Sequence, residues 1–117
     1  GTAKYSAAEY ADAVTLFTQA LDELKASGVE DEMAVGIRGA LLFNIARARV
    51  NAYDTDRDPS QLRKALDVYK RVVSEAEQGA GYPAEDVAEA RKEIETLETR
   101  LAELDKQTAN NNTTTPG

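Results

Sequence analysis

The sequence contains no cysteine, no histidine and no tryptophan, and it has only three prolines in 117 residues. Without cysteine the chain can form neither a disulfide nor a thiolate metal site. Without histidine or cysteine, catalysis would depend on carboxylates, lysine and tyrosine alone, and no glycine-rich phosphate loop or nucleophile elbow accompanies them. We therefore expect a protein that is not an enzyme and that uses no cofactor.

The chain also lacks a long apolar run. None approaches the ~20 residues of a membrane-spanning helix, so we expect no membrane insertion by this segment. Its 14 basic residues are outnumbered by 21 acidic ones, which gives a net charge of −7. An acidic chain repels phosphate backbones and anionic lipid, and this argues against nucleic acid as a partner. The lack of cysteine fits the cytoplasm and the cell envelope alike, while the threonine- and asparagine-rich end favours a bacterial cell envelope.

The residues in the middle of the chain are mostly strong helix formers, and this predicts an all-α fold. The length suffices for one domain with one core. We assign residues 6–106 to the helical domain and residues 1–5 to a lead-in, with Gly1 as the remnant of a cleaved tag on a fragment of a longer protein. Residues 107–117 are rich in threonine and asparagine, and we expect them to form a disordered linker or tail.

The first helix is predicted over residues 6–27. Ser6 and Glu9 have the spacing of a capping box at its start, and Gly28 follows it as a residue free to adopt positive φ. Its apolar stripe recurs at helical spacing and consists of Tyr10, Ala13, Val14, Phe17, Ala20, Leu21 and Leu24.

The second helix is predicted over residues 30–53 and contains the most apolar stretch of the chain. Steps of three and four residues define its buried stripe: Ala34, Ile37, Leu41, Ile45, Ala48 and Ala52. Four residues lie beside that stripe and cannot all be buried with it: Phe43, Asn44, Arg47 and Asn51. Gly36 and Gly39 indicate either a weak first turn or the close approach of another helix. We therefore expect one side of this helix in a core and another facing a partner.

The third helix is predicted to begin with Asp58 as its N-cap and Pro59 in its first turn, and to end at Gly79. Its stripe consists of Leu62, Ala65, Leu66, Tyr69, Val72, Val73 and Ala76. The fourth helix begins at Pro83 and has a narrow apolar seam flanked by charges, so it should pack on one side only. The seam consists of Val87, Ala90, Ile94, Leu97, Leu101 and Leu104.

The first and third helices align at a constant offset of 52 residues. The pairs are Tyr10 with Leu62, Ala13 with Ala65, Val14 with Leu66, Phe17 with Tyr69, Ala20 with Val72 and Leu21 with Val73. Any two amphipathic helices align somewhere. The fixed order of small, aliphatic and aromatic residues nevertheless favours an internal repeat.

Residues 10–21, Tyr-Ala-Asp-Ala-Val-Thr-Leu-Phe-Thr-Gln-Ala-Leu, resemble the second helix of the tetratricopeptide repeat (TPR) family. Residues 64–69 echo this pattern, and residues 41–48, Leu-Leu-Phe-Asn-Ile-Ala-Arg-Ala, are similar to the family's first helix, with Ala46 at its small position. The resemblance implies stacked antiparallel helix hairpins, with the fourth helix as a polar cap.

The resemblance spans residues 5–105, but this chain departs from the family in three respects. The first helix of the first repeat is missing or trimmed. The offset is 52 residues rather than ~34, and the extra length falls in a longer second helix and in the loops. Arg49 also stands where the family usually has an aromatic residue. We therefore expect a divergent array of roughly one and a half repeats plus the cap.

The family binds peptides in a groove lined by its first helices. The resemblance therefore implies that the second predicted helix presents Ala40, Phe43, Asn44, Arg47 and Asn51 to such a groove. An asparagine there can hydrogen-bond a peptide backbone, and an arginine can bind a carboxylate with two parallel hydrogen bonds. In the alternative interpretation, Phe43 packs under the N-terminal segment and Arg47 pairs with acidic residues of the first or fourth helix.

Two further patterns have simpler interpretations. Asp54, Asp56 and Asp58 match the opening of an EF-hand loop, but Pro59 and Ala65 occupy the positions that require glycine and glutamate, so we expect no metal site. Basic residues of the third helix and acidic residues of the first are expected to form solvated faces, with a basic partner-binding patch as the alternative. The basic residues are Arg63, Lys64, Lys70 and Arg71.

The sequence thus favours a non-catalytic scaffold that binds a peptide or helix of a partner protein in a TPR-like groove. The alternative is a structural spacer or a homo-oligomerisation module of a larger protein.

Overall fold

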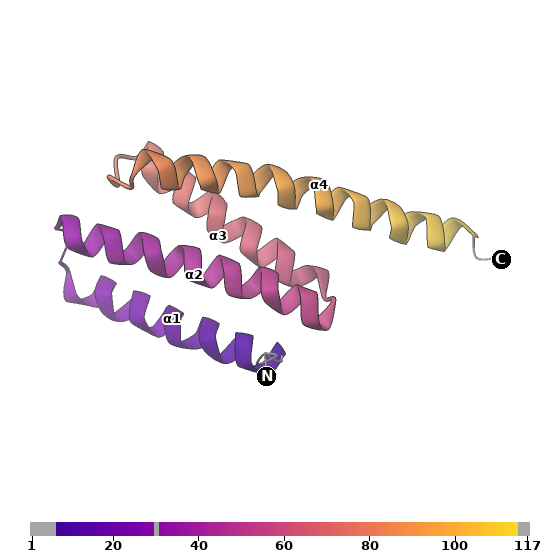
Figure 1. Ribbon diagram of the computed structural model, residues 1–117, viewed down its shortest axis with the longest axis horizontal. Helices are drawn as coiled ribbons and strands as arrows, with labels where there is room; N and C mark the ends of the chain where they lie inside the picture. Colours follow the sequence, from indigo (N-terminus) through magenta and orange to yellow (C-terminus); the bar gives the residue numbers. More distant parts are fainter. Residues whose placement is uncertain (1–6, 30, 115–117) are drawn as a thin grey trace, which may run out of the picture.

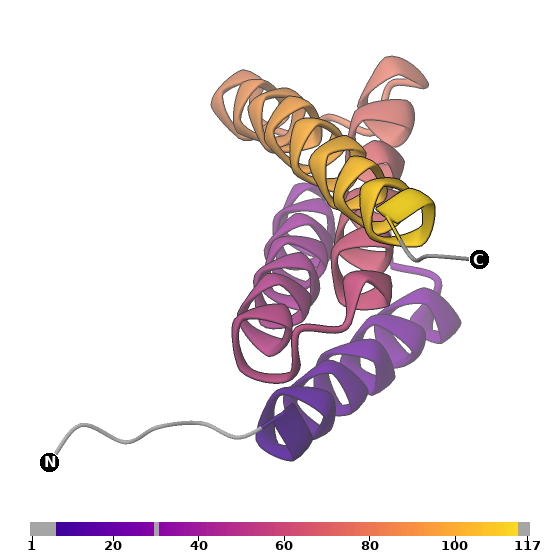
Figure 2. The ribbon, with the colours of Figure 1, turned by 90° about the vertical axis from the view of Figure 1, so that its right-hand side faces the viewer.

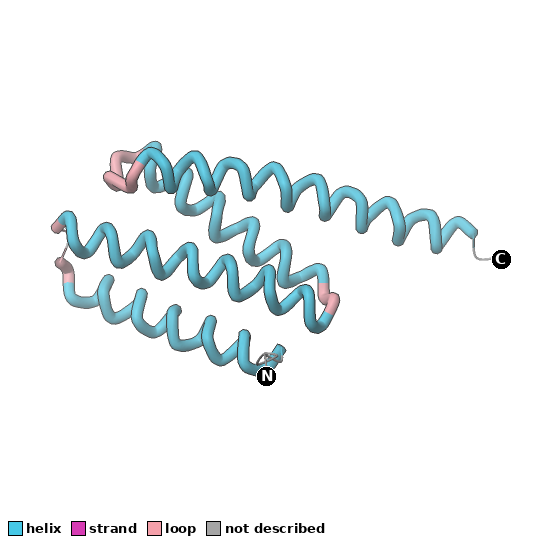
Figure 3. Tube along the Cα trace, viewed as in Figure 1, coloured by secondary structure: helices cyan, strands magenta, loops and turns pink. Residues whose placement is uncertain are grey.

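The computed structural model describes residues 7–29 and 31–114. These residues form four α-helices joined by short loops and contain no β-strand (Figures 1 and 3). The helices are α1 (Ala7–Ser27), α2 (Glu32–Asp56), α3 (Pro59–Glu77) and α4 (Ala84–Thr114). The all-α prediction is confirmed.

The helices pack in chain order, each against the next. Among the described residues, no Cα atom of α1 lies within 8 Å of one in α3 or α4, and the same holds between α2 and α4. Figure 2 shows α1 and α4 on opposite sides of the central α2–α3 pair. The fold is therefore a stack of antiparallel hairpins. A closed four-helix bundle would bring its first and last helices together around one core.

The aligned positions of α1 and α3 both face inward, but they are buried to different extents. All six aligned residues of α3 are buried, whereas in α1 only Val14 and Leu21 are buried and the other four remain partly exposed. The difference arises because α3 packs against both α2 and α4, while α1 packs against α2 alone among the described helices. The 52-residue alignment therefore identifies the inward face of both helices.

Helix ends follow local chemistry. The Asp58 carboxylate accepts a hydrogen bond from the backbone N–H of Ser60 over 3.0 Å, and Pro59 begins α3, as predicted. Gly28 has a φ of 71° at the end of α1, where a side chain would strain the backbone. Ser6, half of the predicted capping box, lies outside the described residues.

The second helix is longer than predicted at its C-terminal end. It continues past Tyr53 to Asp56 and ends where Arg57 adopts the left-handed conformation, with a φ of 57°. The Arg57 backbone N–H then donates to the Tyr53 carbonyl over 2.8 Å, which satisfies an acceptor that the helix end would leave free. The guanidinium of Arg100 on α4 lies 4.8 Å from the centre of the Tyr53 ring and ties α4 to this end of α2.

The predicted seam of α4 packs on the core. Ala90 and Leu97 are buried, and the other four seam residues are partly buried against the core. The helix does not stop at the predicted boundary, because residues 107–114 continue it. Extending an existing helix requires no new nucleation step. A polar segment that follows a packed helical segment can therefore remain helical. Residues 115–117 lie outside the described part of the chain.

The structure corrects the single buried stripe predicted for α2. The buried residues lie on two sides of the helix, because α2 packs against both α1 and α3. One group is Ala34, Ile45, Ala48 and Ala52, and the other is Gly39, Leu42, Phe43, Ala46 and Tyr53. Ile37, predicted in the core, is instead 46% exposed.

Candidate functional site

A third side of α2 is left uncovered by the other described helices, and we call it the α2 face. By helical geometry its residues lie within one stripe that runs the length of the helix. They are Met33, Ile37, Ala40, Asn44, Arg47 and Asn51. Asn44 is partly buried and the other five are exposed, with Met33 at 74%. The N-terminal half of this face is apolar and the C-terminal half carries hydrogen-bonding groups.

Four of the five residues predicted for the groove lie on this face: Ala40, Asn44, Arg47 and Asn51. Phe43 does not. It is only 8% exposed and lies in the core, where its ring meets that of Tyr69 edge-on at a centroid distance of 5.8 Å. The prediction that Phe43 is presented to a partner is therefore corrected. Among the described residues Phe43 packs on α3, and the N-terminal segment of the alternative interpretation lies outside them.

Tyr69 links the α2 face to α4. Burial and then the carboxylates of Glu93 and Glu89 raise the pKa of the Tyr69 phenol to about 12, and the positive charge of Arg47 partly opposes them. These groups influence one phenol only because they lie near it. The Tyr69 phenol therefore feels opposite charges, from Arg47 on α2 and from two carboxylates on α4.

A hollow of about 340 Å³ lies beside the polar half of the α2 face, between α1 and α2. On the α1 side Glu9, Tyr10, Ala13 and Phe17 line it, and on the α2 side Asn44, Arg47, Ala48 and Asn51 do. Aromatic side chains thus stand opposite amide and guanidinium groups. Such a lining offers apolar contact and hydrogen bonding to the same ligand.

The polar side chains that α2 contributes to this hollow do not hold the described helices together. Within residues 7–29 and 31–114, no hydrogen bond or ion pair engages the side chains of Asn44, Arg47 or Asn51. The predicted alternative, in which Arg47 pairs with an acidic residue of the first or fourth helix, is not seen there. The donors of these three side chains are therefore not used by hydrogen bonds or ion pairs among the described residues.

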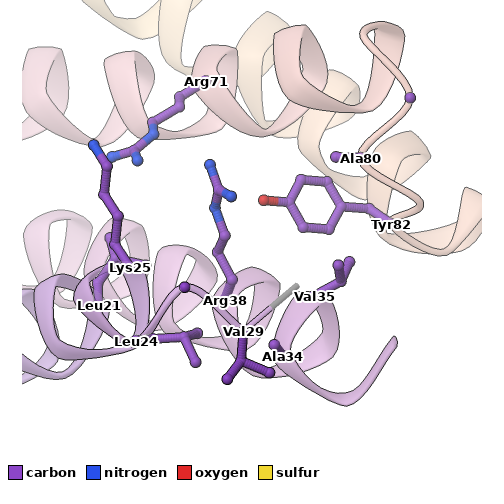
Figure 4. A pocket seen from close by; sticks show the side chains of 12 residues that line it. Leu21, Leu24, Lys25, Val29, Ala34, Val35, Arg38, Arg71, Ala80 and Tyr82 are labelled. Carbon is purple, nitrogen blue, oxygen red and sulfur yellow. The ribbon is translucent and has the colours of Figure 1, made fainter. Parts of the chain in front are cut away.

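A second hollow, of about 290 Å³, lies at the opposite end of the α1–α2 hairpin (Figure 4). Lys25 of α1, Arg38 of α2 and Arg71 of α3 line it, together with Tyr82 from the segment before α4. Sequence patterns do not connect these residues. They come from different helices, so no regular spacing in the chain joins them.

The aspartates of the EF-hand-like segment stabilise the turn between α2 and α3. Asp56 accepts from the backbone N–H of Asp58 over 2.9 Å and from the Gln61 side chain over 3.1 Å. The backbone N–H of Ser60 holds the pKa of the Asp58 carboxyl below its ordinary value. In the described part of the chain, no group of three or more acidic side chains is placed to hold a metal ion.

Compared with models of protein families, with curated proteins and with solved structures, the chain matches none. None of the described helices has the length and apolarity needed to cross a bilayer.

Proposed function

We propose that this chain is a non-catalytic protein-interaction module, and that the α2 face binds a peptide or helix of a partner protein. The observation that carries the proposal is the α2 face itself, where apolar side chains continue into amide and guanidinium groups with no partner among the described residues. Scattered exposed apolar residues are ordinary, but a contiguous stripe beside a hollow is typical of an interaction site.

The chemistry of the face indicates what the partner segment contains. Met33 and Ile37 offer apolar surface to a side chain such as leucine or phenylalanine. Farther along the helix, Asn44 and Asn51 can pair with backbone amides, and Arg47 can pair with a carboxylate. A segment with apolar residues followed by an acidic one matches this order. The resemblance to the TPR family supports the same use of this helix.

A random peptide library displayed on phage tests the proposal, because it selects ligands for the chain whatever its partner is. Peptides selected on the wild-type chain should bind at least ~10-fold more weakly to an Asn44→Ala, Arg47→Ala double variant, because contact residues near the centre of an interface carry most of the affinity. Lys92→Ala serves as the control, since Lys92 is exposed on α4 and has no ion pair among the described residues. Equal binding to all three proteins would contradict the proposal.

The second candidate is self-association. Leu16 of α1 and Met33 of α2 are 65% and 74% exposed, and exposed apolar residues of this size can pair between two copies of a chain. Light scattering across a wide range of protein concentration decides this. A mass that rises with concentration and returns to the monomer value on Met33→Lys would favour the homo-oligomer. A constant monomer mass would exclude it.

A further inference from the structure

The hollow at the connection ends of the hairpins combines an apolar lining with three cationic side chains. We call it the basic hollow. The α1–α2 connection contributes Gly28 and Val29, and the α3–α4 connection contributes Gly79, Ala80 and Tyr82. The remaining apolar lining comes from the helices, namely Leu21, Leu24, Ala34 and Val35. In Figure 4 the Tyr82 hydroxyl and the Arg38 head point toward each other, and both groups bind the carboxylate of Glu75.

The charge of the basic hollow is opposite to that of the protein. Lys25, Arg38 and Arg71 line it, and none of the described lining residues is acidic, although the whole chain has a net charge of −7. One neighbouring carboxylate, that of Glu75, compensates a single charge. Like charges gathered around one hollow repel one another, so an anion between them would lower the electrostatic energy.

Glu75 holds two of the three cations in position. Its Oε2 atom accepts from Nη2 of Arg38 over 2.7 Å and from Nε of Arg71 over 3.0 Å, and the Glu75 side chain is only 18% exposed. Each guanidinium carries five N–H donors, and these contacts use one nitrogen of each. The other donors of Arg38 and Arg71 are therefore fixed in place and still able to bind a second anion.

The third cation, Lys25, has no partner within the described part of the chain. Neither a hydrogen bond nor an ion pair joins its ammonium group to any other described residue. Figure 4 shows the Lys25 side chain extending from α1 toward the level of the Arg71 head. A carboxylate placed among these groups would gain charge-assisted hydrogen bonds from three different helices.

The size and lining limit what accompanies the anionic group. A volume of about 290 Å³ lies just below the ~300–1,000 Å³ that ligand pockets occupy. This favours a small molecule over a folded peptide segment. The aliphatic residues of the lining offer no hydrogen-bonding side chains of their own, so they suit a hydrocarbon chain.

We propose that the basic hollow binds a small amphipathic carboxylate, that is, an aliphatic chain with one carboxylate head. The head lies among Lys25, Arg38 and Arg71, and the chain lies on Leu24, Val29 and neighbouring aliphatic groups. This site is separate from the α2 face and does not depend on the function proposed for it.

Titration with octanoate, followed by calorimetry and methyl NMR, tests this site. Octanoate should bind saturably and shift the methyl signals of Leu21, Leu24, Val29 and Val35. Acetate, which has only the head, and hexanol, which has only the chain, should bind much more weakly. Equal binding of acetate and octanoate, or shifts centred on Met33 and Ile37, would overturn the proposal.

Lysine substitutions test where the carboxylate head of octanoate binds. Lys25→Gln should weaken octanoate binding by about three-fold or more, as expected for one partly exposed ionic contact. Lys92→Gln removes the same charge from the exposed side of α4 and should leave the affinity unchanged. Because Lys25 is exposed and unpaired among the described residues, circular dichroism should show the fold of Lys25→Gln intact. Equal affinity of the two variants would overturn the assignment.

A second pair of variants tests where the aliphatic chain of octanoate lies. Val29→Asp adds a carboxylate to the lining at an exposed loop position and should abolish saturable octanoate binding by repulsion. Leu16→Asp makes the same change on an exposed position of α1 outside the hollow and should have no effect. Octanoate binding that survives Val29→Asp would show that the ligand lies elsewhere.

Discussion

The hydroxyl group of Tyr82 donates a 2.6 Å hydrogen bond to Oε1 of Glu75. It joins the segment before α4 to α3, and the other carboxylate oxygen joins α3 to α2 through Arg38. The Tyr82 ring also lies against the backbone of Gly39 on α2. One partly buried carboxylate and one tyrosine therefore tie three consecutive elements together at this end of the stack.

The stability of the protein should fall in acid partly through Glu75. Burial raises the pKa of this carboxyl, but hydrogen bonds from Tyr82, Arg71 and Arg38 outweigh it and hold the pKa below the ordinary value of 4.5. A lowered native pKa means that the stabilisation is present above about pH 4.5 and is lost as the pH falls through the native value. Glu75→Gln should therefore destabilise the protein by about 1–2 kcal/mol at neutral pH, and by less at pH 3.

Urea denaturation at both pH values measures this difference. Glu95→Gln is the matched control, because Glu95 is exposed on α4 and makes no ion pair or hydrogen bond among the described residues. It should change the free energy of unfolding little at either pH. A Glu75→Gln loss that is the same at neutral pH and at pH 3 would contradict the role of its ionisation.

The two glycines of α2 should respond in opposite ways to alanine. A Cβ atom at position 36 would have no neighbour within 4 Å, so Gly36→Ala should stabilise the protein by up to ~1 kcal/mol through helix propensity. A Cβ atom at position 39 would lie 3.3 Å from Cδ1 and 3.4 Å from Cε1 of Tyr82. Moving this ring would also disturb the hydrogen bond from Tyr82 to Glu75. The free energy of unfolding of Gly39→Ala should therefore be lower than that of Gly36→Ala by about 1 kcal/mol or more.

A double-mutant cycle identifies the cause. In a Tyr82→Ala background the obstruction is gone, and Gly39→Ala should recover the gain that Gly36→Ala shows. If Gly39→Ala stabilised the wild-type chain as much as Gly36→Ala does, the close contact with Tyr82 would have no energetic weight.

Local patterns predicted α1, α3 and α4 well. Each of these helices has one dominant apolar stripe, so the spacing of its apolar residues alone identifies the packed side. Asp58 and Gly28 were also predictable, because capping is decided by neighbours in the chain. The boundary at residue 107 was not predictable from composition, since residues 107–114 continue a helix that has already formed.

The buried sides of α2 could not be predicted from the spacing of its apolar residues. This helix packs on two neighbours, so two buried stripes share one sequence and a single periodic pattern assigns Ile37 and Phe43 to the wrong sides. The basic hollow could not be predicted at all, because Lys25, Arg38 and Arg71 lie on three helices. Only the order in which those helices pack brings them together.

Unfolding energies should separate Phe43 from its polar neighbours on α2. Phe43→Ala removes a buried ring packed on Tyr69 and should cost about 3–5 kcal/mol. Asn44→Ala and Arg47→Ala should each stay within ~0.5 kcal/mol of the wild type, because their side chains make no hydrogen bond or ion pair among the described residues. Urea denaturation of the three variants checks this, and a loss in Arg47→Ala comparable to that in Phe43→Ala would make Arg47 structural.

Alkaline titration should reveal two tyrosines that ionise only at unusually high pH. Burial, and then nearby carboxylates, raises the pKa of Tyr69 to about 12, while burial and the hydrogen bond to Glu75 raise the pKa of Tyr82 to about 12. A raised native pKa contributes stability that is complete below the unfolded value of ~10 and declines as the pH rises toward 12. Absorbance at the tyrosinate band, recorded with circular dichroism, should therefore show Tyr69→Phe and Tyr82→Phe each losing part of the rise near pH 12. The contrary result would be a variant that loses part of the absorbance rise near pH 10 while the helix content stays native. The phenol removed in that variant would then ionise at its ordinary pH in the folded protein, contrary to its burial in the structure.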